Sequence, residues 1–146
     1  MSRHINVQLV VLLGLSVLLL AIPCRAQEPV EEPASPPEER SSLTVTVTVC
    51  TAVEDRDPVG EGSVFPATVE KLFCHTLVEG AEEPTSVTHV WYHGEEKMAE
   101  VILSVNSPHW RTWSSKRIVP GWTGDWRVDV LDEAGEPLAS IAFQVE

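Results

Sequence analysis

Hydrophobic and polar residues alternate along most of the chain after residue 42. In the first such stretch, residues 43–49, Leu or Val occupies every odd position and Thr every even one. A period of two, built from β-branched residues, is typical of a β-strand that buries one face. The same kind of pattern predicts six further strands, at about 69–78, 86–93, 97–105, 110–119, 124–132 and 137–145.

Short segments rich in Gly, Pro and Asn separate these strands. We expect breaks at 58–62, 80–84, 94, 106–108 and 120–121, and a hairpin loop at 132–137. In that loop Gly135 can adopt the left-handed conformation that a short turn requires. Seven short strands without an amphipathic helix predict an all-β fold. The expected architecture is a single antiparallel β-sandwich of immunoglobulin-like type, with a small barrel as the alternative.

The first 26 residues have the pattern of a secretory signal peptide. Arg3 and His4 precede an apolar run from Leu9 to Ile22, and these 14 residues fall short of the roughly 20 that span a bilayer. Cleavage is expected after Ala26, which makes the protein periplasmic or secreted. The alternative is an uncleaved segment, residues 5–22, that anchors the chain in the inner membrane.

Residues 27–42 are predicted to form an acidic, Pro-rich, disordered tether, and residues 43–146 a single folded domain. The tether holds four Pro and five Glu, which leaves too little apolar surface to offset the entropy of ordering it. Without residues 1–26 the protein has 8 Lys and Arg against 22 Asp and Glu, a net charge of −14. This balance argues against nucleic acid as a partner and against an anionic lipid surface. Membrane contact is expected only if the N-terminal segment stays uncleaved.

Two cysteines, Cys50 and Cys74, remain after cleavage. An even number of cysteines in an exported chain predicts a disulfide, because that compartment is oxidising. The alternative is a pair of buried free thiols on neighbouring strands. A catalytic thiol is not indicated, since no Cys-x-x-Cys motif and no adjacent base is present.

Six groups of residues follow one another through the domain in a recognisable order. They are Val53-Glu-Asp-Arg56-Asp-Pro58, then Phe73 with Thr76, His89-Val-Trp91-Tyr92, Trp110-Arg-Thr-Trp113-Ser-Ser-Lys116, Gly124-Asp-Trp126-Arg-Val128, and Gly135 with Phe143. Together they resemble the bacterial family known as domain of unknown function 2914, over about residues 44–146. The resemblance implies an all-β domain, often attached to membrane segments or other modules, and implies no established activity.

All five tryptophans lie within residues 91–126, close to most of the cationic side chains of the domain. Residues 110–127 carry a local charge of +3 in a domain whose net charge is −10. Indole rings and guanidinium groups on one sheet can bind a carboxylate, a sugar ring or an acidic partner. The alternative is that these side chains are structural, with Trp91 and Trp126 in the core and the arginines in cross-strand ion pairs.

Alternation along the 110–119 strand separates its side chains into two sets. Arg111, Trp113 and Arg117 share one face and are the preferred ligand-binding residues. Trp110 and Lys116 lie on the other face and are the second choice. Which set faces solvent depends on the packing of the sheet.

Metal binding is not predicted, although four histidines lie in the domain. His89 and His93 share a strand face but are about 13 Å apart along a strand, and no Cys/His spacing of zinc type is present. His89 is expected to be a buried, hydrogen-bonded residue beside Trp91. The carboxylates of residues 54–57 lack the pattern of a calcium loop and are interpreted as a solvated turn in which Arg56 pairs with a neighbour.

The sequence contains no motif of nucleophilic catalysis. Ser114 or Ser115 could be combined with His89 or His109, but the sequence gives no support for a catalytic triad, because no Gly-x-Ser-x-Gly elbow is present. We therefore predict a non-catalytic, exported binding module of the bacterial cell envelope, without a cofactor, that recognises an acidic or carbohydrate ligand or an envelope protein. A structural spacer domain tethered to the membrane is the alternative, and a small hydrolase is the third hypothesis.

Overall fold

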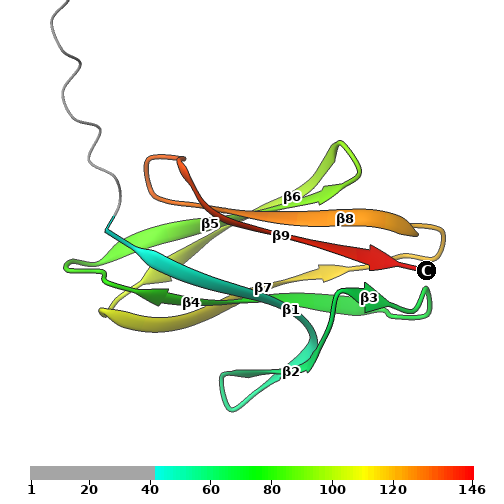
Figure 1. The fold of residues 1–146 in the computed structure, drawn as a ribbon, viewed down its shortest axis with the longest axis horizontal. Helices are drawn as coiled ribbons and strands as arrows, with labels where there is room; N and C mark the ends of the chain where they lie inside the picture. Colours follow the sequence, from blue (N-terminus) through cyan, green and yellow to red (C-terminus); the bar gives the residue numbers. More distant parts are fainter. Residues whose placement is uncertain (1–41) are drawn as a thin grey trace, which may run out of the picture. The chain divides into compact units, whose positions relative to one another are not determined.

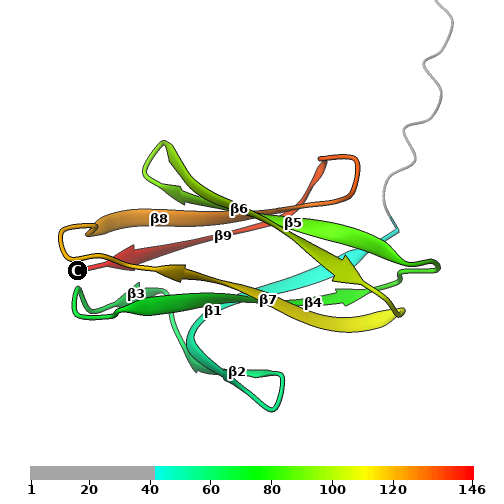
Figure 2. The ribbon, with the colours of Figure 1, turned by 180° about the vertical axis from the view of Figure 1, so that it is seen from behind.

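The computed structural model describes residues 42–146, which form two β-sheets packed face to face (Figure 1). The predicted signal segment and nearly all of the predicted tether lie outside the described residues. The view from behind shows the same two layers (Figure 2). The described part of the chain contains no helix that is long and apolar enough to cross a membrane.

Sheet A contains four strands in the order β2-β1-β4-β7. Their bounds are Thr44–Glu54 for β1, Asp57–Glu61 for β2, Lys71–Glu79 for β4 and His109–Arg117 for β7. Sheet B contains five strands in the order β3-β9-β8-β5-β6. Their bounds are Val64–Phe65 for β3, Thr85–His93 for β5, Glu96–Val105 for β6, Gly124–Leu131 for β8 and Pro137–Val145 for β9.

The pairing of these strands confirms the predicted all-β sandwich of immunoglobulin-like type. Apart from β2 and β3, the remaining strands correspond to the seven that the periodicity predicts. The first, second and fifth predicted strands are β1, β4 and β7 and lie in sheet A. The third, fourth, sixth and seventh are β5, β6, β8 and β9 and lie in sheet B. The first, second and fifth strands thus lie opposite the third, sixth and seventh, as in an immunoglobulin-like sandwich, whereas the fourth strand, β6, lies at the edge of sheet B and not in sheet A. The buried Trp91 on the third strand is one of the hallmarks of such a sandwich. Neighbouring strands are antiparallel except β3, which runs parallel to β9.

Two of the nine strands in the described residues fall where the sequence predicts only a break. β2 and β3 lie within residues 57–65, where Pro58 and Gly60 indicate a turn. Because β2 is an edge strand, the missing N–H of Pro58 is tolerated there. Gly60 has a φ of +69°, and a Cβ at this position would overlap the hydroxyl of Thr51. The turn residues therefore fit an irregular edge strand as well as they fit a loop.

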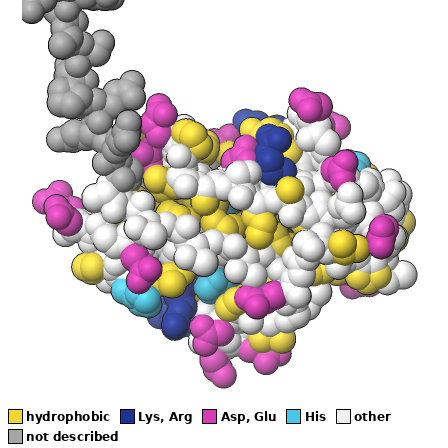
Figure 3. Space-filling model, viewed as in Figure 1, with side chains coloured by type: hydrophobic (Ala, Val, Ile, Leu, Met, Phe, Trp, Pro, Cys, Tyr) yellow, Lys and Arg dark blue, Asp and Glu magenta, His cyan; other side chains and the backbone are white. Residues whose placement is uncertain are grey.

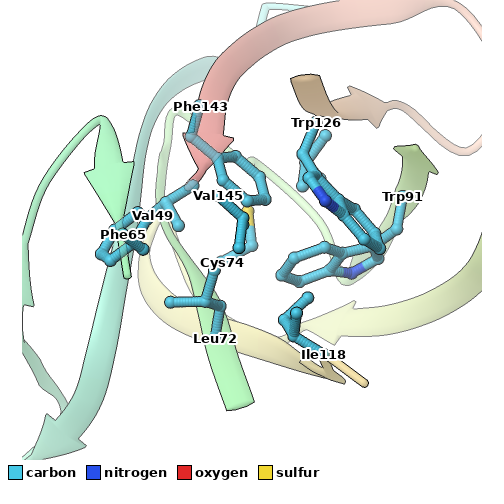
Figure 4. Packing of buried hydrophobic residues seen from close by; sticks show 10 residues of the cluster. Val49, Phe65, Leu72, Cys74, Trp91, Ile118, Trp126, Phe143 and Val145 are labelled. Carbon is cyan, nitrogen blue, oxygen red and sulfur yellow. The ribbon is translucent and has the colours of Figure 1, made fainter. Parts of the chain in front are cut away.

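The core between the sheets is built on the inward-facing tryptophans. Trp91 and Trp126 are 0% and 1% exposed, and both pack against Phe143, Trp91 edge-on and Trp126 stacked. Leu72, Cys74 and other apolar side chains of sheet A close the cluster from the opposite side (Figure 4). For these two tryptophans the structural interpretation is confirmed.

The predicted disulfide is wrong, because Cys50 and Cys74 are both buried and both free. Cys74 faces Val49 across β1 and β4, so the next residue, Cys50, points to the opposite side of the sheet. Thiols on opposite sides of one sheet cannot bond without backbone movement. Burial raises the pKa of Cys50 and raises that of Cys74 to about 12, so both thiols are protonated at neutral pH.

Candidate functional site

Strand β7 carries all five predicted ligand-binding residues and forms one edge of sheet A. Trp110 pairs with Val78 of β4, which is fully buried between the sheets, and Arg111 pairs with Leu77 on the outer side. Alternation therefore places Arg111, Trp113 and Arg117 on the outer face of sheet A. Trp113 is 37% exposed there, which fits the side of the strand on which the sequence prefers a ligand.

The β1–β2 hairpin projects from sheet A on the side away from sheet B (Figures 1 and 2). Its tip is a two-residue turn, because Glu54 pairs with Asp57 and only Asp55 and Arg56 lie between them. Both turn residues are left-handed, with φ values of 49° and 71°. This is the backbone of the tight hairpin turn whose central positions favour Asn, Asp and Gly.

Three contacts hold the hairpin tip against the outer face of sheet A. Nε2–H of His75 on β4 donates to the carbonyl oxygen of Arg56 at 2.9 Å. Nη2 of Arg56 donates to the carbonyl oxygen of Arg111 at 3.4 Å, and Nε of Arg111 lies 3.5 Å from Oδ1 of Asp57. The His75 ring also stacks on Trp113, with the ring planes 8° apart. The hairpin tip is thus in direct contact with β4 and with the first half of β7.

A shallow pocket of about 370 Å³ opens beside the hairpin tip, at the edge of β7. We call it the β7 pocket; it is lined by Arg56, Ser104, Asn106, Trp110, Arg111, Thr112 and Trp113. The guanidinium of Arg56 lies 5.4 Å from the centre of the Trp110 ring, a distance typical of a cation–π contact. Two indoles, two guanidiniums and several neutral polar groups therefore surround one opening.

The structure brings three of the five predicted site residues together in the β7 pocket and separates the other two. Trp110 and Trp113 meet there although they lie on opposite faces of β7, because the pocket wraps around the strand edge. Arg117 is six residues from Arg111, about 20 Å along a strand. Lys116 lies over the Trp122 ring at 5.3 Å. The five predicted residues therefore do not form one binding site.

Four pocket residues, Arg56, Ser104, Asn106 and Thr112, were missing from the sequence prediction. Arg56 sits among three carboxylates in the chain and is predicted to pair with one of them, but the structure turns it onto Trp110. Ser104 and Asn106 come from the end of β6 and the following loop, and nothing in their local sequence indicates a site. Of the four, Arg56 and Thr112 carried a signal, which is their place within the motifs at 53–58 and 110–116.

Charge distinguishes the β7 pocket from the rest of the domain. Residues 43–146 carry 7 Lys and Arg against 17 Asp and Glu. On the face shown in Figure 3, acidic side chains are spread over the surface, whereas Lys and Arg are visible at only a few places. Two of the seven cationic residues lie at the single β7 pocket. The lining itself holds two arginines and no acidic residue, although Asp57 pairs with Arg111 beside it.

A buried hydrogen-bonded cluster lies between the two sheets, directly behind β7. His89 of β5 is fully buried; its Nδ1 lies 2.8 Å from Oγ of Ser114, and its Nε2 lies 2.8 Å from Oγ1 of Thr76. Nε1 of Trp91 donates to the same Ser114 oxygen at 3.0 Å. His89 is thus buried and hydrogen-bonded beside Trp91, as the sequence indicates.

The contacts of the cluster fit a neutral His89 ring that is protonated at Nε2. Because Ser114 Oγ accepts the indole N–H of Trp91, its own hydrogen is free to be donated to Nδ1 of His89. Nε2 then carries the proton and donates to Thr76. Desolvation by burial, and secondarily the nearby His75, lower the pKa of His89 to about 4. The ring is therefore neutral at physiological pH.

The Ser114–His89 contact does not form an accessible catalytic pair. Ser114 is 5% exposed and His89 0%, and no carboxylate is hydrogen-bonded to the ring. Within residues 42–146, no three His, Cys, Asp or Glu side chains are grouped so that they could hold a metal ion. A larger hollow, of about 650 Å³, is lined by loops around Gly80–Pro84 and Asp132–Ala134 and contains carboxylates but no aromatic or cationic side chain. The β7 pocket is the better candidate because its groups differ in chemistry and converge.

Fold and site together define an immunoglobulin-like β-sandwich with a mixed aromatic and cationic pocket at one sheet edge. Residues 84–145 match the family model described as "Protein of unknown function (DUF2914)". The match supports the resemblance found in the sequence motifs, over strands β5 to β9. The motifs at 53–58 and at Phe73 and Thr76 lie outside the matched residues. Among curated proteins, none matches the chain.

Proposed function

We propose that the domain is a non-catalytic, exported binding module of the bacterial cell envelope whose β7 pocket takes a saccharide. The observation that supports this function is the convergence of Trp110, Trp113 and Arg111 on one opening of about 370 Å³. Pockets of a few hundred Å³ that combine aromatic walls with a few polar groups are typical of small-ligand sites.

The chemistry of the lining favours a sugar ring over a purely apolar ligand. An indole can pack against the C–H face of a ring, while Ser104, Asn106 and Thr112 offer hydroxyl and amide groups to its hydroxyls. Within residues 42–146, neither Ser104 nor Asn106 has a side-chain hydrogen bond to another protein group, so both can bond to a ligand. A protein partner or a spacer role would not require such a lining.

The proposal is tested by titrating the purified ¹⁵N-labelled protein with cellobiose, diacetylchitobiose and cellobiouronate. We expect saturable shifts of the indole N–H signals of Trp110 and Trp113 with at least one of these disaccharides. Trp113→Ala should weaken binding about tenfold or more, whereas Ser115→Ala, an exposed neighbour on the same strand face, should not. Absence of any shift with all three sugars would contradict the saccharide site and favour the spacer alternative.

A further inference from the structure

Arg56 is a cationic side chain of the β7 pocket that has no carboxylate partner among the described residues. Its protein contacts are the 3.4 Å hydrogen bond to the carbonyl oxygen of Arg111 and the stacking on Trp110. Arg111, by contrast, is already opposite Asp57 at 3.5 Å. In a domain with more than twice as many acidic as basic residues, a guanidinium left without a carboxylate is available to an anion from outside.

The backbone at Arg56 is an independent indication. Its φ of 71° is left-handed, and the position is the second central residue of the hairpin turn. Gly is favoured at such a position because side chains with a Cβ are strained there. An arginine in this place positions a guanidinium over Trp110 against the local conformational preference. Strain of this kind is found where a side chain serves a site.

We propose that Arg56 is the carboxylate-binding residue of the β7 pocket, and that the ligand is a saccharide carrying a single carboxylate beside the ring that packs on the indoles. This inference rests on the proposed saccharide function. Arg56 lies against Trp110, so one ligand can contact the indole with its ring and the guanidinium with its acid group. The planar guanidinium matches a carboxylate with two parallel hydrogen bonds.

The surrounding charges limit the ligand to one anionic group at this place. Glu54, Asp55 and Asp57 flank Arg56 in the hairpin, and Asp57 already compensates Arg111. The remaining cations of β7, Lys116 and Arg117, lie toward the other end of the strand. A polyanion would therefore meet carboxylates on both sides of Arg56, which repel it.

The test compares cellobiouronate with cellobiose, two disaccharides of the same ring structure that differ in one carboxylate. We expect the wild-type protein to bind cellobiouronate roughly tenfold tighter, as measured by the shift of the Trp110 indole N–H signal. Arg56→Gly should remove this preference, so that this variant binds cellobiouronate no more tightly than it binds cellobiose. Because Gly relieves the left-handed strain, the thermal midpoint of this variant should stay equal or rise by a few degrees.

Arg127→Ala is the matched control, because Arg127 lies on sheet B, where it pairs with Asp129 at 2.9 Å. This variant loses the same charge and should keep the preference for the acid. Retention of the preference in Arg56→Gly, or its loss in Arg127→Ala, would overturn the role of Arg56. Equal binding of both sugars by the wild type would also overturn it while leaving the saccharide site intact. Binding of neither sugar would instead contradict the proposed function.

Discussion

The Oγ atom of Ser114 lies 2.8 Å from Nδ1 of His89, in a position closed to solvent from both sheets. Ser114 belongs to sheet A and His89 to sheet B, so this hydrogen bond links the two layers of the sandwich. The indole N–H of Trp91 donates to the same oxygen. The serine therefore fixes the packing of two core side chains, and β7 owes its position over the core partly to this contact.

Replacing Ser114 by Ala should destabilise the domain markedly. The change leaves the N–H of Trp91 and the Nδ1 acceptor of His89 buried without a partner, and each unmet group costs about 1–3 kcal/mol. We expect the free energy of unfolding in urea to fall by about 3 kcal/mol. Ser115→Ala removes the same hydroxyl from the exposed side of the strand and should change stability by less than about 0.5 kcal/mol. Equal effects of the two variants would mean that the buried cluster adds nothing to stability.

The free energy of unfolding should fall as the pH decreases below neutral, because His89 stays unprotonated in the folded domain. Burial lowers the pKa of His89 to about 4 from an ordinary value of 6.5, so between these values the unfolded chain binds a proton that the folded domain does not. The contribution of this group to the free energy of unfolding is fully present above about pH 6.5. It decreases by about 3 kcal/mol as the pH falls to about 4.

The protonation of His89 can be observed directly in the wild-type protein. In a ¹H–¹³C NMR titration, the ring signals of His89 should stay constant from pH 7 to about pH 5. In a ¹H–¹⁵N spectrum, the nitrogen shifts should be those of the tautomer that is protonated at Nε2, which fits the contacts with Ser114 and Thr76. A midpoint for His89 near the ordinary value would contradict the sealed position of the ring.

Both cysteines should be free and unreactive in the folded protein. Cys50 and Cys74 are buried on opposite sides of sheet A and are protonated at neutral pH. Since the thiolate is the reactive form, iodoacetamide should modify neither residue under native conditions. In denaturant without any reductant it should modify both, which mass spectrometry would detect as one adduct on the peptide of each residue. Failure to modify either residue until reductant is added would show a disulfide instead.

Two tryptophans should respond to substitution in opposite ways. Trp113 lies on the outer face of sheet A, so Trp113→Ala should cost roughly 1 kcal/mol of stability or less, mainly through lost stacking on His75. Trp126 is 1% exposed and packs on Phe143, so Trp126→Ala should cost about 3–5 kcal/mol. Urea denaturation measures both values. A loss for Trp113→Ala as large as that for Trp126→Ala would make Trp113 a core residue and remove it from the site.

The strands were largely predictable from the sequence, because each long strand has one buried face and therefore a period of two in hydropathy. This holds for β1, whose odd positions from Val45 to Val49 face the core, and for β8, whose Trp126, Val128 and Val130 do. It fails for β2, where Pro58 and Gly60 occur and where most side chains are exposed. A strand without a buried face has no hydropathy signal, so only its pairing with β1 reveals it.

The sequence by itself predicted the sandwich, the buried His89 and the sharing of one face of β7 by Arg111, Trp113 and Arg117. All of these follow from local alternation, which is a property of each strand alone. Only the tertiary structure decided that the thiols are separate and that the face of β7 with Arg111 and Trp113 is the outer one. The tertiary structure alone also decided that the hairpin turn places Arg56 over Trp110. These outcomes depend on how strands pair, how the sheets pack and how a turn bends, which the hydropathy pattern of one strand does not encode.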